Sequence, residues 1–223
     1  MNKLLDNKIE QQVRDVLTNM INPVKVMFFG SDQQDRCEYC EDTKTLLSEV
    51  SALSEKIDFE AFSIEQEPDT ASKYGVEKIP TTVIAAVKDG SIIDYGIRLS
   101  GIPAGHEFNT LINDLILVSS QESGLSQKSR EFLKQLDSPV HMMVFVTPTC
   151  PYCPQAVILA HRMALESPMV TAEMVEAMEF PELSERFDVS GVPQTTINDG
   201  AGTLVGAAPE ERLLNEIKKA LLN

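Results

Sequence analysis

The spacing of apolar residues along the 223-residue chain predicts alternating helices and strands. Residues 4–20 and 126–136 carry apolar side chains at helical spacing. Each segment is followed by a proline and then by a run rich in β-branched and apolar residues, at 24–29 and 140–146. The pattern therefore predicts a helix followed by a buried strand near the start of each half of the chain.

The same succession continues in both halves. A further helix ends near Leu53 or Leu165, a strand follows at 57–64 or 171–177, and a short helix ends before Val76 or Val189. Two strands then meet at Asp89-Gly90 or Asp199-Gly200, a dipeptide that is a strong turn signal, and amphipathic helices at 104–119 and 209–222 complete the halves. Each half is predicted to be an α/β unit in which helices cover a mixed sheet.

The chemistry-bearing residues also repeat. A shift of 113 residues places Cys37 and Cys40 on Cys150 and Cys153, and the segment 79–84 (IPTTVI) on 192–197 (VPQTTI). In each half the proline of that segment follows the second cysteine by 40 residues. We interpret this as an internal duplication, with one domain at 1–120, a second at 121–223 and the linker beginning at Gln121.

The net charge of the chain limits the kinds of partner that it can bind. The net charge of −15 is spread over both halves, with 11 basic against 20 acidic residues before Gln121 and 8 against 14 from there on. An acidic surface disfavours nucleic acid and anionic membrane as partners. Residues 1–8 lack the apolar core of a secretory signal, and no apolar run approaches a membrane span. We therefore expect a cytoplasmic protein, or a mature form from which a signal has been removed.

All four cysteines lie in two CxxC pairs, which in a reducing compartment are more often catalytic or metal-binding than structural. A strand that leads through a short loop into a helix is expected to place Cys150 at the helix N-terminus, with Pro151 at the first helical position. Unpaired backbone N–H groups and the helix dipole there favour a thiolate. Cys153 would then resolve a mixed disulfide formed at Cys150, and Cys37 and Cys40 repeat the arrangement.

A CPYC sequence after a strand, a downstream [Val/Ile]-Pro-x-Thr segment and a glycine after the last strand resemble the thioredoxin and glutaredoxin superfamily. Two such units, together with the stretch GIPAGHEF at 101–108, closely resemble the glutaredoxin-like protein disulfide oxidoreductases of thermophilic archaea and bacteria. The resemblance implies two tandem thioredoxin/glutaredoxin-like folds, each a mixed β-sheet flanked by helices. It also implies exchange with protein thiols or disulfides and a thioredoxin-reductase-like flavoprotein as electron donor. No cofactor beyond the redox-active disulfides is implied.

The resemblance further implies a peptide-binding groove beside each pair. Pro80 and Pro193 match the family's cis-proline, and the backbone before each is left free to bind an extended substrate. We expect the following residues to contribute to substrate binding, the two tyrosines also being open to an ordinary packing role: Ile79, Pro80, Val192, Pro193, Gly101, Gly206, Tyr39 and Tyr152. Glycine is expected at the third side of each groove because a side chain would block close backbone approach.

The two pairs differ in their surroundings. Around Cys37 stand Asp32, Asp35, Glu38, Glu41 and Asp42, with Arg36 as the only nearby basic residue, whereas uncharged residues flank Cys150. Nearby acids raise a thiol pKa, so we expect the CPYC disulfide to be the more oxidising, near the glutaredoxin range of about −200 to −230 mV. The alternative is that these acids only cap a helix.

Two other functions fit the cysteines. The four thiolates could hold one structural zinc ion, although 109 residues separate the pairs and each has its own downstream proline. The chain could instead resemble the N-terminal electron-delivery part of the alkyl hydroperoxide reductase flavoprotein, which feeds a peroxiredoxin. Neither strand before the cysteines contains an acid, which leaves the proton acceptor for Cys153 unassigned.

Overall fold

The computed structural model describes residues 3–222 and contains the predicted order of elements. The first half forms α1 (Asn7–Leu17), β1 (Val24–Gly30), α2 (Cys40–Ser51), β2 (Ile57–Ser63), α3 (Pro68–Lys73), β3 (Thr81–Lys88), β4 (Ser91–Ser100) and α4 (Glu107–Ser120). The second half forms α5 (Gln127–Lys134), β5 (Val140–Val146), α6 (Cys153–Glu166), β6 (Val170–Glu176), α7 (Pro181–Arg186), β7 (Gln194–Ile197), β8 (Gly202–Val205) and α8 (Glu210–Ala220).

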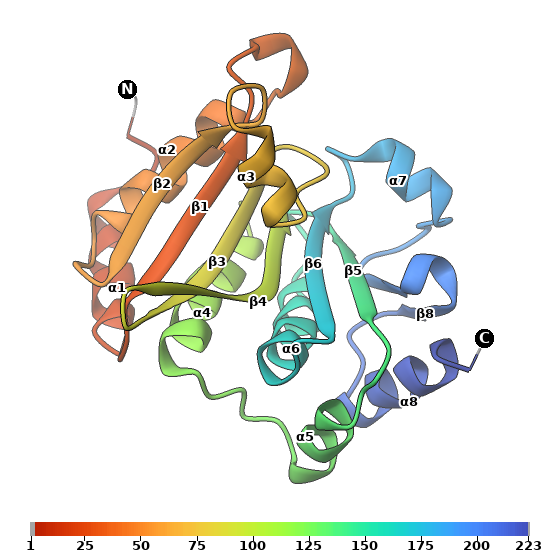
Figure 1. Ribbon diagram of the computed structural model, residues 1–223. Coiled ribbons are helices and arrows are strands. Elements are labelled where there is room, and N and C mark those ends of the chain that lie inside the picture. The colour runs from red at the N-terminus through yellow and green to blue at the C-terminus, as the bar shows by residue number, and fades with distance from the viewer. Residues whose placement is uncertain (1–2, 223) are drawn as a thin grey trace.

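All eight strands belong to one sheet, in the order β2-β1-β3-β4-β6-β5-β7-β8 (Figure 1). The strands of each half keep the same internal order, and the halves join where β4 pairs in parallel with β6, from Ile97 opposite Ala172 to Ser100 opposite Val175. β3 runs antiparallel to β1 and β4, while β5 runs parallel to β6. β1 and β5 therefore point the same way and end at the same edge of the sheet.

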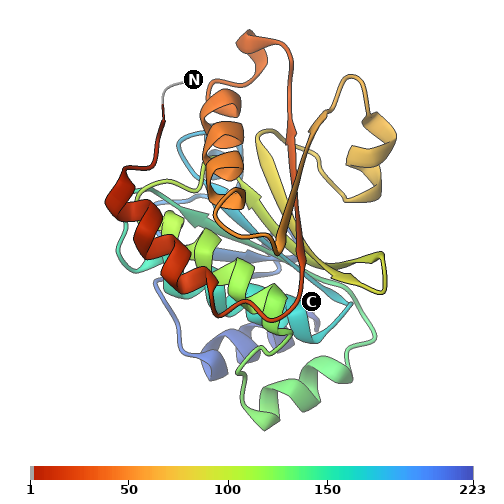
Figure 2. The ribbon, with the colours of Figure 1, turned by 90° about the vertical axis from the view of Figure 1, so that its left-hand side faces the viewer.

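Helices cover both faces unequally. Figure 2 shows α1, α2 and α4 on one side of the sheet and α3 on the other. The larger core lies on the first side and runs through both halves, from Val26 and Leu111 to Val144 and Ile217. On the opposite side two smaller clusters lie under α3 and α7. Within residues 3–222, no helix combines the length and apolarity needed to cross a lipid bilayer.

Local sequence explains these elements. α1 begins after Asp6, whose carboxylate accepts hydrogen bonds from the backbone N–H groups of Lys8 and Ile9, and the helix buries Val13 and Leu17. β5 is an almost continuous apolar run because it lies inside the sheet between β6 and β7 and is covered on both faces. The predicted turn at Asp89-Gly90 joins β3 to β4, with positive φ at both residues.

The turn predicted at Asp199-Gly200 is confirmed: it joins β7 to β8, with positive φ at both residues. β7 ends at Ile197 and a short 3-10 segment, Asn198–Gly200, precedes β8. The Asn198 side chain accepts a hydrogen bond from the N–H of His141 (2.7 Å) and donates one to the carbonyl of Pro139 (3.1 Å). These bonds tie the loop to the start of β5 and draw Asn198 out of the strand.

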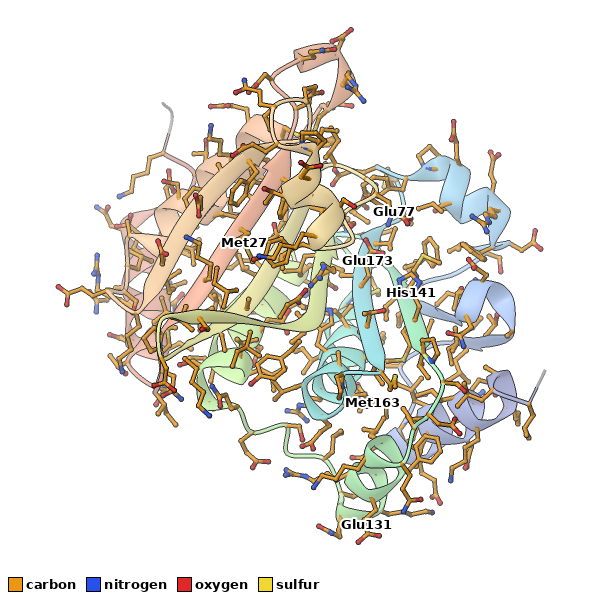
Figure 3. The ribbon with its side chains drawn as sticks, in the orientation of Figure 1. Met27, Glu77, Glu131, His141, Met163 and Glu173 are labelled. Atoms are coloured by element: carbon orange, nitrogen blue, oxygen red, sulfur yellow. A yellow bond between two sulfur atoms is a disulfide. The ribbon has the colours of Figure 1, made fainter. Side chains whose placement is uncertain are left out.

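A buried polar cluster lies where the two halves meet. Glu173 on β6 accepts hydrogen bonds from the Lys78 ammonium (2.8 and 3.0 Å) and from the hydroxyl of Ser100, and His141 lies 3.7 Å away (Figure 3). Burial alone would raise the pKa of Glu173, but His141 and Lys78 hold that pKa at about 2. The junction thus contains a buried carboxylate from the second half that pairs with an ammonium group from the first half.

Replacement of Lys78 by alanine should therefore lower the free energy of unfolding by about 3 kcal/mol, because it leaves the Glu173 carboxylate buried without its ammonium partner. Since the folded-state pKa of Glu173 is lowered from 4.5 to about 2, the stabilisation is present above about pH 5 and is lost as pH falls toward 2. Urea unfolding at pH 7 and pH 3 measures both effects. The exposed Lys88→Ala variant is the control and should change stability by less than about 0.5 kcal/mol; equal effects of the two variants would contradict the role of the cluster.

Candidate active site

Each CxxC pair lies at the point where a central strand gives way to a helix. β1 leads to Cys37 and Cys40, and β5 leads to Cys150 and Cys153. Both pairs are disulfide-bonded, with Cα atoms 5.4 and 5.5 Å apart. Because β1 and β5 end at the same edge of the sheet, both disulfides lie along that edge.

The predicted helix starts need correction. α6 begins at Cys153, and Cys150 and Pro151 lie in the turn before it, so Pro151 is not the first helical residue. The N–H of Cys153 donates to the carbonyl of Cys150 (3.4 Å), which closes a turn that the helix then continues. α2 likewise begins at Cys40, with Cys37 extended before it. In both pairs the second cysteine is the first residue of the helix and the first cysteine stands just outside it.

The predicted prolines lie at the same edge of the sheet as the pairs. The Ile79–Pro80 and Val192–Pro193 bonds are cis, as the resemblance implies. Ile79 and Pro80 line a cavity of about 620 Å³ together with Cys37. Pro80 directly precedes β3, whose first residue, Thr81, lies opposite Phe29 near the end of β1. Pro193 directly precedes β7, whose first residue, Gln194, lies opposite Phe145 near the end of β5.

The predicted glycines complete each arrangement through the backbone. The N–H of Gly101 donates to the carbonyl of Pro80 (2.8 Å), and the N–H of Gly206 donates to that of Pro193 (2.7 Å). Both glycines have positive φ, 93° and 87°, which an L side chain rarely adopts. We expected glycine at both positions because a side chain would lack room. This holds at Gly101, where an added Cβ would lie 2.5 Å from Glu176 Cβ. At Gly206 an added Cβ would meet no atom of the described residues within 4 Å.

The two tyrosines of the CxxC loops are exposed. Tyr152 has 67% of its surface exposed, and Tyr39 also lies at the surface and lines the cavity that contains Cys37. Met178 is exposed as well and lines the same cavity as Tyr39. The exposure of Tyr152 does not support an ordinary packing role for it.

The first pair is surrounded by carboxylates, as the sequence suggests. A second cavity, of about 670 Å³, contains both sulfur-bearing residues and the acids Asp32, Asp35, Glu38, Glu41 and Glu67. Arg36 is engaged by Glu65 (2.7 Å), whose pKa is lowered first by its hydrogen bond with Ser31. Arg36 is not the only basic residue here, since Lys44 on α2 also lines the cavity.

Glu107 is a candidate functional residue that sequence reasoning missed. It begins α4 and is buried, and burial raises its pKa to about 7 although Thr110 donates to its Oε2 (2.5 Å). Its Oε1 has no hydrogen-bond partner among the described residues. The preceding residue, His106, donates its N–H to the carbonyl of Pro148 (2.9 Å), two residues before Cys150. The acid in GHEF was visible in the sequence, but the bond that links the residue before it to the loop before Cys150 is made only in the fold.

Glu176 and Glu179 were also missed. Glu176 is the last residue of β6, and Glu179 follows in the next loop; both line the cavity that holds Cys37 and Pro80, although they belong to the other half of the chain. Oε1 of Glu179 accepts a hydrogen bond from the N–H of Ile102 (2.7 Å), the residue after Gly101. No local pattern could have linked them to Cys37, because the contact depends on the pairing of β4 with β6.

The zinc alternative does not fit this arrangement. β1 and β5 are separated by four interstrand spacings, or about 19 Å at about 4.8 Å each. Four sulfurs around one zinc ion would each lie about 2.3 Å from it. The strands that lead to the two pairs are thus much farther apart than two ligands of one zinc ion.

Known proteins have similar sequences and structures. A family model described as a thioredoxin domain matches residues 140–219. The protein disulfide oxidoreductase of Aeropyrum pernix K1 superposes with a TM-score of 0.87 at 33% identity, over 97% of this chain and 94% of that one. A mutant form of the alkylhydroperoxide reductase protein AhpF from Enterococcus faecalis superposes with a TM-score of 0.85 at 28% identity, over 96% of this chain and 99% of that one.

Curated relatives agree with the second match. The F subunit of alkyl hydroperoxide reductase from Staphylococcus aureus is 27% identical over 197 residues, which are 87% of this chain and 34% of that protein. The corresponding protein of Staphylococcus epidermidis is 29% identical over 192 residues, or 85% of this chain and 33% of that protein. This chain spans about a third of the length of the curated relatives it matches.

An α/β structure with a CxxC disulfide at a strand-to-helix junction and a cis-proline beside it defines the chain as a thioredoxin-fold protein of the oxidoreductase class. Its match over nearly the full length of the A. pernix protein is more specific than the fold. The chain belongs to the protein disulfide oxidoreductase family.

Proposed function

We propose that the chain catalyses thiol–disulfide exchange on protein substrates through two CxxC sites, the first formed by Cys37 and Cys40 and the second by Cys150 and Cys153. The observation that carries this proposal is that both pairs form disulfides beyond the ends of β1 and β5, at one edge of the sheet, and that a cis-proline directly precedes the strand paired with each of these ends. The disulfides themselves act as the redox centres, and the proposal requires no bound cofactor and no metal.

Cys37 and Cys150 are the attacking residues in this mechanism. Each precedes its helix, where the unpaired N–H groups of the first turn favour a thiolate. At the second site the difference in access supports the assignment, since Cys150 is 9% exposed and Cys153 is fully buried. The attacking thiolate forms a mixed disulfide with the substrate, and Cys40 or Cys153 then displaces the substrate and closes the CxxC disulfide.

The substrate lies along the cis-proline in this proposal. Backbone groups of Ile79 or Val192 bind an extended substrate segment, with Gly101 or Gly206 forming the third side of the groove and Tyr39 or Tyr152 contacting the substrate from the CxxC loop. The exposure of Tyr152 and the open space around Gly206 support this role at the second site. At the first site the cavity shared by Cys37, Tyr39 and Pro80 supports it.

Glu107 is the proton acceptor for Cys153. A carboxyl group whose pKa is about 7 can take a proton from a thiol and return it near neutral pH. The unpaired Oε1 and the contact of the preceding residue with the loop before Cys150 support the assignment.

The duplication extends to whole domains in this proposal. Residues 1–120 and 121–223 are two tandem thioredoxin/glutaredoxin-like folds whose sheets are fused edge to edge. The same order of helices and strands in each half supports it, as does the left-handed conformation of Gln121 at the end of α4. Four interstrand spacings, about 19 Å, separate the sites, so each exchanges with external partners rather than with the other.

Redox partners follow from the chemistry. The clients are proteins with thiols or disulfides, and a thioredoxin-reductase-like flavoprotein supplies electrons in a reducing, cytoplasmic compartment. Nucleic acid and membranes are not proposed as partners, because both halves are acidic.

Electron delivery to a peroxiredoxin is the second candidate function. The alkyl hydroperoxide reductase relatives support it, because they are similar to this chain over more than four fifths of its length. The matched part is about a third of each of those proteins. Faster reduction of an oxidised peroxiredoxin than of insulin by the reduced chain would favour this function.

Single-site variants test the proposed exchange. Cys37→Ser and Cys150→Ser should each retain insulin reduction and refolding of a scrambled disulfide protein through the intact site, whereas the double variant should lose at least about 100-fold in rate because no attacking thiol remains. Turnover with dithiothreitol as reductant measures the effect, and thermal unfolding checks that each variant is folded. Undiminished activity in the double variant would contradict the mechanism.

The two sites should differ in potential. Carboxylates surround the first pair and uncharged residues flank the second, so the CPYC disulfide should be more oxidising by about 30 mV, which corresponds to a tenfold difference in equilibrium constant for two electrons. Redox titration of the Cys37→Ser/Cys40→Ser and Cys150→Ser/Cys153→Ser variants measures each site alone. Indistinguishable potentials would show that the acids do not tune the first site.

A further inference from the structure

The first site has a wall that comes from the other half of the chain. Glu176, the last residue of β6, and Glu179, in the loop before α7, line the cavity that contains Cys37 and Pro80. The cavity excludes Cys40, so these acids lie on the side of Cys37 that faces the cis-proline and the proposed substrate groove. At the second site the corresponding strand, β8, is the last strand of the sheet formed by residues 3–222, so no strand from the other half pairs with it.

Glu176 is held in an unusual state for a carboxyl group. Only 3% of its surface is exposed, and its Oε2 accepts a hydrogen bond from the N–H of Glu179 (2.6 Å). Its Oε1 is buried without a hydrogen-bond partner among residues 3–222. Burial raises the pKa of Glu176, although the backbone N–H groups of Glu179 and Met178 act in the opposite direction.

Glu179 is fixed against the groove itself. Its Oε1 accepts from the N–H of Ile102, while the neighbouring Gly101 N–H donates to the carbonyl of Pro80. An added Cβ at Gly101 would lie 2.8 Å from that same oxygen, so only glycine admits the carboxyl group here. Burial, followed by the charges of Glu176 and Glu38, raises the pKa of Glu179 to about 7.

Other charged and titratable groups also face this space. Those that line the cavity from the first half are Arg36, Cys37, Glu38, Tyr39 and Asp42. Glu38, Asp42 and the phenol of Tyr39 carry no positive charge that could balance a Glu179 carboxylate. Arg36 is already paired with Glu65. Glu176 and Glu179 are the only glutamates that the β6–α7 segment contributes to the lining.

We propose that Glu179, positioned by Glu176, is the proton donor and acceptor for the substrate sulfur at the first site. This rests on the proposed exchange function of Cys37. In the reducing direction the Cys40 thiolate attacks Cys37 sulfur, the bond between Cys37 and the substrate breaks, and the substrate sulfur leaves with the electron pair. The Glu179 carboxylic acid gives it a proton and becomes a carboxylate. In the oxidising direction the carboxylate takes the proton from the attacking substrate thiol.

The test uses the full chain with the second site inactivated, Cys150→Ser/Cys153→Ser, and compares it with the same protein carrying Glu179→Gln. Both proteins are first reduced and then mixed with one of two probes. The first is a cystine-bridged peptide, whose alkyl thiol needs a proton when it leaves. The second is an aryl disulfide, whose more acidic thiol leaves without one. At pH 6 the Glu179→Gln variant should reduce the peptide at least about tenfold more slowly, with no more than a roughly twofold change for the aryl disulfide. At pH 9, where the parent has lost the Glu179 proton, the two proteins should agree within about twofold on both probes.

Two further proteins serve as controls. Glu182→Gln removes an exposed acid from α7 in the same background and should leave all rates unchanged. Glu179→Gln with only the second site intact, Cys37→Ser/Cys40→Ser, should also leave them unchanged. An equal loss on both probes at both pH values would show a structural role and overturn the inference, as would no loss on the peptide at pH 6. If the parent reduces neither probe, the proposed function of the first site fails and this inference fails with it.

Discussion

The parallel pairing of β4 with β6 is the constraint on which the rest of the structure depends. It joins the strands of both halves into one sheet, from Ile97 opposite Ala172 to Ser100 opposite Val175. Its direction makes β1 and β5 end at the same edge, which is why both disulfides face the same way. The pairing is accompanied by a buried carboxylate, Glu173, whose charge is matched by Lys78 from the other half. A buried Glu173 carboxylate without a positive partner would destabilise the packing of the two halves against each other.

The same pairing makes two similar sites unequal. The first site lies beside the junction, so the segment after β6 forms one side of its cavity and brings Glu176 and Glu179 to it. The second site lies toward the free edge of the sheet, where the space around Gly206 is open. The residues that follow β4 serve both sites, since Gly101 binds Pro80 and His106 binds Pro148. A duplicated sequence can therefore yield two different chemical environments without a change in the cysteine spacing.

Much of this was predictable from local patterns. Helical and alternating apolar spacing identified the elements, and the 113-residue repeat related each CxxC pair to its proline. Cis peptide bonds at Pro80 and Pro193 followed only from resemblance to a family, because the residues themselves carry no such signal. Local details escaped prediction. The helices begin at Cys40 and Cys153 rather than earlier, and the bond of Asn198 to the N–H of His141 ties the last turn to β5. Glu107, Glu176 and Glu179 could not be assigned because chain segments distant in sequence bring them to the sites.

The central claim is that one sheet edge carries two exchange sites too far apart to react with each other. A chain with Cys40→Ser and Cys153→Ser retains only the two attacking cysteines, Cys37 and Cys150, four strands apart. A disulfide requires Cα atoms within about 7 Å, whereas the strands that lead to these cysteines lie about 19 Å apart. Oxidation at low protein concentration, followed by digestion and mass spectrometry of the monomer, should yield no peptide that links Cys37 to Cys150. Such a link in high yield would contradict the fused sheet and the independence of its two sites.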